Sequence, residues 1–275
     1  MHTPVLLKEV IEALDVQKSG KYIDATFGEG GHSDEMIRKG GNVLAIEWDE
    51  ESVRKKLKDK RWNEEKGKFK LVEGNFADIE RIARQNNFFP VNGILFDLGL
   101  SMEQISRSGR GFSFKNLDEP LDMRISKETD KTAAEIINSL SAGQLYEIFA
   151  KNAQEINSWA IAEAICRARR MKKIETVGEL VVIVKGGKSS KKRVFQALRM
   201  EVNHELDNLK NGLEGALKII KPQGRIAILT FHQTEDRQVK KMVKEKGIEE
   251  LTRKPIRAKV PYSFEKTAIL RILVC

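Results

Sequence analysis

The chain has 275 residues, of which 40% are hydrophobic. This length and composition allow one large domain or two modest ones with a packed core, and they exclude a disordered protein. Lysine and arginine total 49 against 40 acidic residues, so the formal net charge is +9. Such an excess favours an anionic partner, most often nucleic acid, although a lysine-rich proteome would produce the same excess.

Neither cysteine usage nor hydropathy indicates a membrane or an oxidising compartment. Cys166 and Cys275 lie far apart without metal-ligand or redox spacing, so we expect a reducing compartment and no bound metal. The opening VLLKEVIEAL carries charges within an amphipathic pattern, which is typical of a helix rather than of a signal peptide. No apolar run is long enough to span a bilayer, so we expect a soluble, cytoplasmic protein with no membrane partner.

Strands and helices are expected to alternate in the first hundred residues. Apolar runs that end at Gly, Asn or acidic residues predict strands at residues 21–26, 42–49, 69–74 and 91–100. Amphipathic patterns between them predict helices at residues 33–39, 50–60 and 79–86. Nearly continuous apolar strands that alternate with helices predict a parallel sheet covered on both faces, which is an α/β fold.

The alternation stops after residue 104. A loop rich in Gly, Ser and charge is followed by helices only, at residues 132–140, 142–150, 156–171 and 175–184. Residues 185–193, KGGKSSKKR, are expected to form a basic hinge or loop before one long helix at 195–220 and a further core strand at 224–232. We therefore expect an α/β core of residues 1–110 and 196–275, interrupted by a helical insertion at 111–195.

A glycine-rich turn, DATFGEGGHS at residues 24–33, follows the first expected strand. Ligands of open α/β sheets bind beyond the carboxyl ends of the strands, and glycines let a ligand approach the backbone closely. Gly28, Gly30 and Gly31 are therefore candidate cofactor residues. Glu47 ends the second strand, where an acid can accept hydrogen bonds from two ribose hydroxyls. Asp49 is a rival for that role, but we favour it as the cap of the next helix.

The third and fourth strands end in further candidates. Phe76 stands where an adenine ring could be held, although core packing is the commoner place for a phenylalanine. Asp97 points into the expected cleft, with a helix cap as the alternative. His32 follows the glycine turn directly and is a credible pocket residue. These positions indicate a nucleoside-containing cofactor, and the incomplete G-x-G-x-x-G pattern disfavours NAD relative to S-adenosylmethionine.

Several motifs together resemble one family across nearly the whole chain, from His2 to about Arg271. They are HTPVLLKEV, DATFGEGGHS, DLGLSMEQ, RGFSF, PLDMR, FQALRMEVNHEL, GRIAILTFH and EDR. In this order they closely resemble the MraW-type small-subunit ribosomal RNA methyltransferases, which methylate cytidine N4 in the decoding centre. The resemblance implies a class I, Rossmann-like core with an inserted all-helical domain for substrate recognition. It also implies an S-adenosyl-L-methionine site, which is lined by Gly30, Gly31, His32, Glu47, Phe76, Asp97 and Gln104.

Three segments depart from the family pattern. The family's FHSLEDR reads FHQTEDR here, with Gln233 and Thr234 changed. The segment YSFEKTAILR keeps only Ala268, Leu270 and Arg271 of a basic run that could touch RNA. The stretch FAKNAQEINSWAIAEAI also differs from the family's glycine- and glutamate-rich helix start. The altered C-terminal segment puts the hold on substrate in doubt more than the cofactor site.

Transfer of a methyl group to an exocyclic amine requires positioning and desolvation above all. Asp97 is the expected catalytic residue, because a hydrogen-bond acceptor draws the amine toward a more nucleophilic form. The target base must leave its stack, and Phe112 and Phe114 are candidates to stack on it or, equally, to anchor their loop. Further candidates for contact with RNA are Arg107, Arg110, Arg124, the basic run with Lys192 and Arg193, and His232.

Three other functions remain open from the sequence. The core could methylate DNA or another amine, although the D/N-P-P-Y/F turn of DNA amino-methyltransferases is absent. It could be a nucleotide-dependent oxidoreductase, which the missing third glycine disfavours. It could also be a non-enzymatic RNA-binding factor in ribosome assembly. The expected partner is small-subunit ribosomal RNA or the small subunit itself, and a homodimer is left open.

Overall fold

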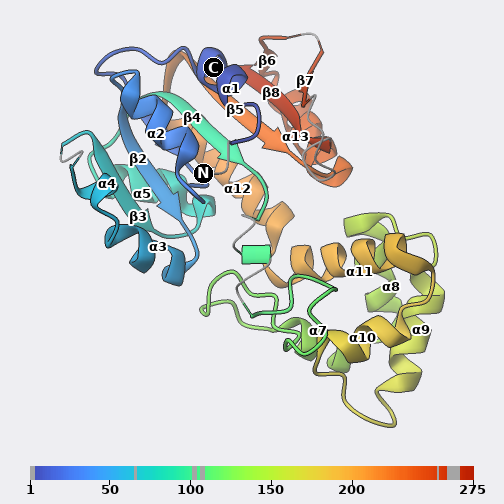
Figure 1. Cartoon of the computed structure of the whole chain (residues 1–275). Helices are drawn as coiled ribbons and strands as arrows, with labels where there is room; N and C mark the ends of the chain where they lie inside the picture. Colours follow the sequence, from blue (N-terminus) through green and yellow to red (C-terminus); the bar gives the residue numbers. More distant parts are fainter. Residues whose placement is uncertain (1–3, 65–66, 101–103, 106–108, 253, 259–266) are drawn as a thin grey trace. The chain divides into compact units, whose positions relative to one another are not determined.

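The computed structural model describes residues 4–64, 67–100, 104–105, 109–252, 254–258 and 267–275. The chain forms two compact units, coloured along the sequence in Figure 1. Unit 1 comprises Met1–Gly99 and Leu206–Cys275, and unit 2 comprises Leu100–Glu205. Among the described residues, no helix is both long and apolar enough to cross a membrane.

Unit 1 is built on one mixed, mostly parallel sheet. Its strands are β1 (Lys21–Asp24), β2 (Asn42–Glu47), β3 (Phe69–Glu73), β4 (Val91–Asp97), β5 (Ile220–Thr230), β6 (Glu249–Glu250), β7 (Ile256–Arg257) and β8 (Ile269–Val274). The strand order is β3-β2-β1-β4-β5-β8-β6, and β7 also pairs with β8. Strands β1 to β5 pair in parallel, whereas β8 runs antiparallel to each of its partners.

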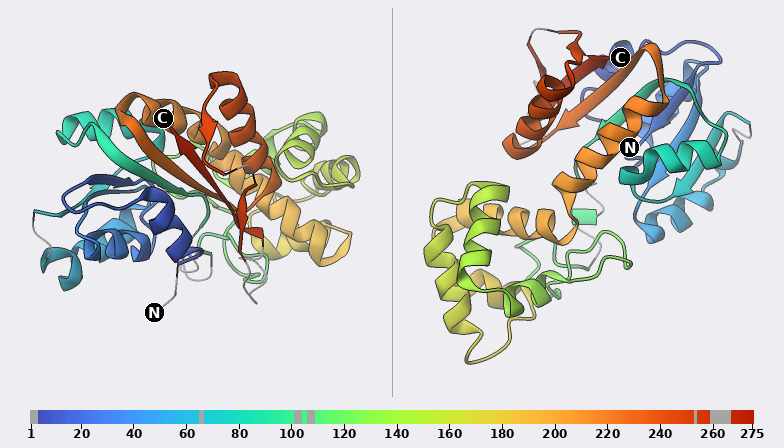
Figure 2. Two further views of the ribbon diagram at one scale, coloured as in Figure 1. Left: turned by 90° about the horizontal axis from the view of Figure 1, so that it is seen from above. Right: turned by 180° about the vertical axis from the view of Figure 1, so that it is seen from behind.

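Helices cover both faces of this sheet (Figure 2). They are α1 (Leu7–Leu14), α2 (Gly31–Arg38), α3 (Glu50–Leu57), α4 (Lys60–Glu64), α5 (Ile79–Gln85), α12 (Glu205–Ile219) and α13 (Gln233–Lys246), with a 3₁₀ turn, η1, at Phe76–Asp78. Side chains alternate along each strand, so Tyr22 packs with α1 and α2 while Ile23 packs with α5, α12 and α13. The expected parallel α/β core is confirmed, and its double apolar covering explains the continuous apolar strands.

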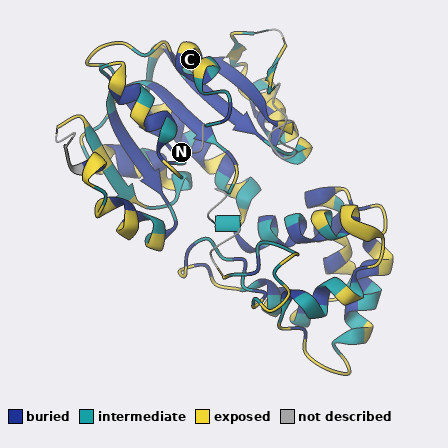
Figure 3. Cartoon of the chain, viewed as in Figure 1, coloured by how far each residue is buried: buried dark blue, intermediate teal, exposed yellow. Residues whose placement is uncertain are grey.

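Unit 2 is all-helical in its regular structure. It contains α7 (Ala133–Ser139), α8 (Ala142–Ala153), α9 (Ser158–Ala168), α10 (Val177–Ile183) and α11 (Gly187–Val202). Their inner faces form one buried cluster that includes Phe149, Ile165 and Leu198 (Figure 3). Capping boxes begin α7, α8 and α10, where Thr132, Ser141 and Thr176 accept from the backbone three residues on. These caps are why three short helices start where the sequence predicts them.

Two expectations near the end of unit 2 are wrong. The predicted single helix at 195–220 is two helices, because His204 adopts a left-handed backbone with φ of 48° between α11 and α12. Most of the predicted basic hinge at 185–193 is helical, because α11 begins at Gly187. Ser190 is buried there and Arg193 pairs with Glu155, so tertiary contacts make these polar residues helical.

The contacts divide the chain at Gly99/Leu100 and Glu205/Leu206, rather than at the expected 110/111 and 195/196. The difference at the second boundary has a clear packing reason. Phe195, Leu198 and Val202 of α11 lie in the buried cluster of unit 2. The whole of α11 therefore belongs with the helical unit, although its sequence runs on directly into α12.

Candidate active site

Three acidic residues of unit 1 end neighbouring parallel strands. Asp24 ends β1, Glu47 ends β2 and Asp97 ends β4. Strands β2, β1 and β4 are adjacent in the sheet and parallel, so their carboxyl ends meet at one edge. This edge is where open α/β sheets bind their ligands.

Asp24 organises the turn that follows β1. Its Oδ2 accepts a hydrogen bond from Ser33 Oγ at 2.7 Å, and its Oδ1 accepts from the Thr26 backbone N–H at 3.3 Å. Burial raises the pKa of Asp24 to about 6, and these two hydrogen bonds oppose that rise. Thr26 extends the link to the next strand, because its Oγ1 accepts from the Asp97 backbone N–H at 2.6 Å.

Glu47 joins the glycine turn to the end of β2. Its Oε2 accepts from the Gly28 backbone N–H and its Oε1 from the Asp49 backbone N–H, both at 2.9 Å. Burial raises the pKa of this carboxyl, and the backbone N–H groups of Asp49, Gly28 and Trp48 oppose the rise. Asp49 caps α3 by accepting from Glu51 N–H, as the sequence analysis favours. The carboxylate of Glu47 is thus held in place by backbone donors around the turn.

Asp97 and His32 face each other beside this turn. His32 Nδ1 lies 3.6 Å from Asp97 Oδ2, and His32 Nε2 lies 3.2 Å from the carbonyl oxygen of Val5. Burial raises the pKa of Asp97 to about 7, and the charge of Asp24 adds to that rise. Burial lowers the pKa of His32 to about 4, so the ring is neutral at neutral pH. No described residue donates a hydrogen bond to the Asp97 carboxylate, whose side chain is 25% exposed.

Glycine is required for different reasons at the three positions of the turn. A Cβ on Gly30 would lie 2.4 Å from the Trp62 ring, and one on Gly31 would lie 2.3 Å from Pro4 Cγ. These two positions need glycine because the protein's own side chains fill the space beside them. Gly28 has φ of 52° and only the Thr26 carbonyl oxygen, at 3.8 Å, near a built Cβ. Gly28 is therefore the one of the three with open space beside it.

Phe76 and Asn75 lie at the end of β3. Asn75 caps η1 by accepting from the Ala77 backbone N–H at 2.9 Å. The Phe76 ring is half-buried and meets Phe96 edge to face, with ring centroids 5.7 Å apart. It also lies against Gly212 of α12. This ring thus packs into the core of unit 1, which was the alternative to an adenine contact.

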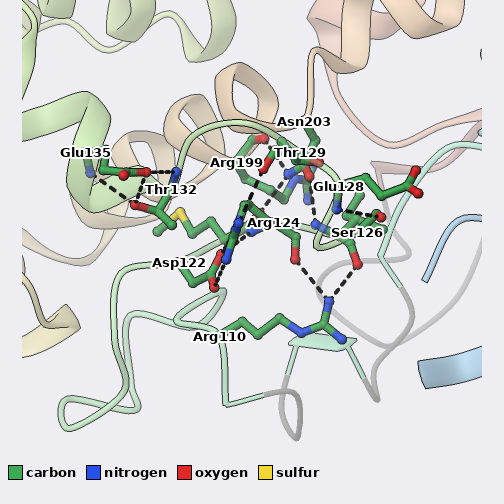
Figure 4. A network of polar contacts seen from close by, with 12 residues as sticks. Arg110, Asp122, Arg124, Ser126, Glu128, Thr129, Thr132, Glu135, Arg199 and Asn203 are labelled. Carbon is green, nitrogen blue, oxygen red and sulfur yellow. Dashed lines mark hydrogen bonds and ion pairs between the residues drawn. The ribbon is translucent and has the colours of Figure 1, made fainter. Parts of the chain in front are cut away.

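Unit 2 holds two of the expected arginines in its own loop (Figure 4). Arg110 Nη1 donates to the backbone carbonyls of Arg124 and Ile125, at 3.0 and 2.6 Å. Arg124 pairs through two nitrogens with Asp122, at 2.7 and 3.1 Å. Asn203, which is fully buried, accepts from Ile125 N–H and donates to the Met123 carbonyl, both at 2.8 Å. Both arginines are therefore engaged in shaping the loop around residues 109–129.

The remaining expected residues of unit 2 are placed as follows. Phe112 and Phe114 are half-buried against the helical cluster, and Phe114 meets Phe195 edge to face at 6.0 Å. Arg193 Nε donates to the buried Glu155 at 2.7 Å, whereas Lys192 is exposed. Gln104 lies in this unit, in a short described helical segment. Arg107, Ser101 and the segment 259–266 lie outside the described residues.

His232 precedes α13 in unit 1. Glu235 accepts hydrogen bonds from the backbone N–H groups of Phe231 and His232, at 2.9 and 3.1 Å. One helical step on, Asp236 forms a buried ion pair with Arg271 of β8, at 2.7 Å. The residues that the altered FHQTEDR motif keeps therefore fasten α13 to the sheet. Among the described residues, no cluster of His, Cys, Asp and Glu could hold a metal ion.

Sequence reasoning missed several residues that build this edge. Asp24, Thr26 and Ser33 connect β1, β4 and α2, and Pro4 lies against Gly31. Asp24 and Ser33 stand at the two ends of the quoted turn motif, which was a usable signal. No sequence signal indicated the contact of Pro4 with Gly31, because the two residues are far apart in the chain.

The sheet order, the single reversed strand β8 and the acidic strand ends define a class I, Rossmann-like methyltransferase. Residues 1–271 match the model of the MraW methylase family. The chain belongs to this family. A similar protein of Bacteroides fragilis, named ribosomal RNA small subunit methyltransferase H, is 39% identical over 257 residues, covering 90% of this chain and 82% of its own. A protein of the same name from Thermomicrobium roseum is 42% identical over 250 residues, covering 87% and 76%.

Two solved structures align with most of the chain at low sequence identity. A ribosomal RNA methylase from Streptococcus thermophilus aligns with a TM-score of 0.48 and 10% identity, covering 100% of this chain and 98% of its own. A Streptococcus mutans protein in complex with SAH aligns with a TM-score of 0.46 and 13% identity, covering 100% and 99%.

As a member of a methylase family, the chain uses S-adenosyl-L-methionine as its cofactor. The residues at the strand ends fit such a group. The cofactor carries a positive sulfonium and an amino group, and Asp97 offers a partly exposed carboxylate without a donor from the described residues. Its ribose hydroxyls need acceptors, and the Glu47 carboxylate at the end of β2 supplies acceptor oxygens. Gly28 leaves room for a ligand beside the backbone.

Proposed function

We propose that this protein transfers a methyl group from S-adenosyl-L-methionine to N4 of a cytidine in the decoding centre of small-subunit ribosomal RNA. Family membership and the names of the two curated relatives support the RNA substrate. The observation that carries the reaction is the Asp97 carboxylate, which ends β4 partly exposed, with no donor from the described residues and a raised pKa. Such a carboxylate is ready to accept a hydrogen bond from an exocyclic amine.

Each residue of the site receives a role in this proposal. Asp97 is the catalytic residue, because its acceptor oxygen localises the lone pair of the cytosine amine for in-line attack. Glu47 holds the ribose of the cofactor, and Gly28, Gly30, Gly31 and His32 form the wall of its site. When bound, the cofactor supplies the electrophilic methyl group. The protein contributes position and exclusion of water, which are the main requirements of this displacement.

The other candidate residues receive supporting roles. Phe76 supports the adenine side from its place in the core, and Gln104 completes the cofactor site. Arg110 and Arg124 shape the loop that carries Phe112 and Phe114, and this loop presents the substrate. His232 places the start of α13. The helical unit recognises RNA, the partner is small-subunit RNA or the small subunit in the cytoplasm, and no membrane is involved.

The proposal is tested by methyl transfer to small ribosomal subunits that lack the decoding-centre mark. Labelled cofactor gives the rate, and nucleoside mass spectrometry identifies the product. We expect N4-methylcytidine with the parent protein and a loss of about 10²- to 10⁴-fold in rate with Asp97→Asn. The matched control is Asp207→Asn, an exposed aspartate of α12. A different methylated nucleoside, or an Asp97→Asn variant as active as the parent, would overturn the proposal.

A further inference from the structure

Four lysines without acidic partners lie at the start of α11, three in its first turns and Lys185 just before the N-cap Gly186. Lys185, Lys188 and Lys192 are exposed and Lys191 is half-exposed. Among the residues that the structure describes, none of the four pairs with a carboxylate, and α11 has no acid in its first turn. We call these four residues the lysine surface.

The charges of the lysine surface stand at the unfavourable end of their helix. Cations stabilise the C-terminus of a helix and oppose the partial positive charge at its N-terminus. No side chain caps α11, which starts at Gly186 with φ of 107°. Three other exposed cations of unit 2 do have partners, since Lys151 pairs with Glu147, Arg167 with Glu163 and Lys172 with Glu179. A local electrostatic cost that nothing nearby offsets indicates a role in binding.

Arg193 does not belong to this surface, although the sequence groups it with the lysines. Its Nε donates to Glu155, which is 3% exposed, and its Nη1 donates to Ser189 Oγ at 3.0 Å. Glu155 also accepts from the buried Ser190 at 3.1 Å. This cluster fixes the start of α11 against the segment between α8 and α9, so the four lysines are presented on a rigid base.

An exposed aromatic pair borders the same segment. Asn157, the residue before α9, has its amide nitrogen 3.5 Å from a Cβ built on Gly186. Two residues on, Trp159 is 52% exposed and meets Tyr146 of α8 edge to face at 5.7 Å. Exposed aromatic rings beside a groove or patch of lysines are the combination that single-stranded nucleic acid requires, because bases stack while phosphates pair with cations.

We propose that the lysine surface, together with Trp159 and Tyr146, binds single-stranded RNA of the small ribosomal subunit. Phosphates lie on the four lysines and an unstacked base lies on the aromatic pair. The net charge of +9 favours the same polyanion. This inference rests on the proposed function in taking RNA as the partner, and it adds which surface of the helical unit holds the chain.

The test measures binding of a fluorescein-labelled single-stranded oligoribonucleotide as a function of salt. Lys188→Ala, Lys191→Ala and Lys192→Ala are combined in one variant. Three lost phosphate contacts should reduce the slope of log K against log salt by about 2 and weaken binding at low salt at least about tenfold. The matched control combines Lys151→Ala, Arg167→Ala and Lys172→Ala, which removes the same charge from paired side chains that are 74%, 67% and 77% exposed.

Trp159→Ala separates stacking from charge. It should weaken binding about tenfold and leave the salt slope unchanged. Its control is Met171→Ala, an apolar side chain of the same unit that is 90% exposed. Circular dichroism and cofactor calorimetry verify that each variant is folded. Equal slopes for the lysine variant and its control would overturn the inference, as would binding that Trp159→Ala does not change.

The same proteins are assayed for N4-methylcytidine on small subunits, which separates this inference from the proposed function. If the lysine variant methylates normally and its salt slope is unchanged, the inference about the lysine surface is wrong and the proposed reaction stands. If the lysine variant has a reduced salt slope but the parent protein makes no N4-methylcytidine, the RNA-binding surface stands and the proposed reaction is wrong. We expect the lysine variant to show both a reduced salt slope and less N4-methylcytidine, and its control to show neither change.

Discussion

His32 Nδ1 lies 3.6 Å from Asp97 Oδ2, while Nε2 of the same ring lies 3.2 Å from the Val5 carbonyl oxygen. A carbonyl can only accept, so Nε2 carries the ring proton and Nδ1 is a bare acceptor. The low pKa of His32 keeps the ring in this neutral form. Two acceptors therefore face each other, and their separation is too long for a hydrogen bond. An N–H₂ group of a substrate could donate to both.

The activity should depend on the ionisation of Asp97. Only the carboxylate accepts freely, and the pKa of Asp97 is raised to about 7. We expect kcat/KM to rise about tenfold per unit below pH 7 and to level off near pH 8. Asp97→Asn should lose this acidic limb together with most of the rate. A profile that is flat from about pH 5.5 to 8.5 in the parent would contradict the assigned role.

The same carboxyl should reduce stability as pH rises. The folded-state pKa of about 7 lies above the unfolded value of 3.8, so the folded protein holds this proton more tightly. The favourable contribution is complete below about pH 4 and is lost as pH rises through 7. Asp97→Asn should therefore raise the free energy of unfolding by about 2 kcal/mol at pH 8 and change it little at pH 4.

Denaturant unfolding of parent and variant at the two pH values checks this expectation. Asp118→Asn, at an exposed site, controls for the loss of one negative charge. Equal stability of Asp97→Asn and the parent at pH 8 would mean that burial does not penalise this carboxylate.

The sequence predicts the parallel core well because its signal is local. Each strand of β1 to β4 is an apolar run that ends at a polar residue, and packing on both faces requires that pattern. Glu47 and Asp97 were found for the same reason, since a strand end is visible in the sequence. The helical patterns after residue 104 predicted the inserted unit, and the resemblance added the family, which periodicity alone could not identify.

The misses all depend on contacts between distant segments. The start of α11 reads as a loop because nothing local shows that Arg193 pairs with Glu155. The break between α11 and α12 is not visible in the sequence, because the hydrogen bonds of Asn203 with Met123 and Ile125 join segments far apart in the chain. The sequence also does not show that the Trp62 ring lies beside Gly30, because that ring comes from another helix.

The glycines of the turn should separate in their effects. Gly30→Ala combines φ of 80° with overlap against the Trp62 ring, so it should destabilise unit 1 by about 2 to 4 kcal/mol. Gly28→Ala meets only backbone strain, which costs about 1 kcal/mol. Its methyl group would enter the open space beside the turn, and calorimetry should show cofactor affinity at least about tenfold weaker.

Gly247→Ala is the matched control for Gly28→Ala. It has φ of 63°, no atom near a built Cβ and a place at the end of α13. It should lose similar stability and keep the parent's cofactor affinity. Equal affinities for Gly28→Ala and Gly247→Ala would show that the cofactor does not use the space at Gly28.

Asn203 should be required for the loop of unit 2. Its buried amide accepts from Ile125 N–H and donates to the carbonyls of Met123 and Arg199. Asn203→Ala leaves these groups unpaired, so we expect a loss of about 2 to 4 kcal/mol. Hydrogen exchange at the Ile125 amide should become faster in Asn203→Ala. It should stay unchanged in the control variant Asn138→Ala. Unchanged exchange at Ile125 would contradict this anchoring role.

Arg193 and Lys192 are neighbours, but we expect their loss to affect stability very differently. Arg193→Ala leaves the buried Glu155 without its cation, so it should destabilise unit 2 by about 3 kcal/mol. Lys192→Ala should change stability by less than about 0.5 kcal/mol, because the side chain is exposed and has no carboxylate partner among the described residues.

The pH dependence of the Arg193→Ala deficit identifies its cause. Burial alone would raise the pKa of Glu155, but the Arg193 side chain and the Asn157 backbone N–H outweigh it and hold the pKa below its usual value. The pair therefore stabilises the parent above the unfolded pKa, and this contribution is lost as pH falls through the folded value. The deficit should be largest near pH 7 and shrink on acidification, and Glu155→Gln in the Arg193→Ala background should recover part of it. A deficit that is independent of pH would mean that lost packing of the Arg193 stem, rather than an unpaired buried charge, accounts for the effect.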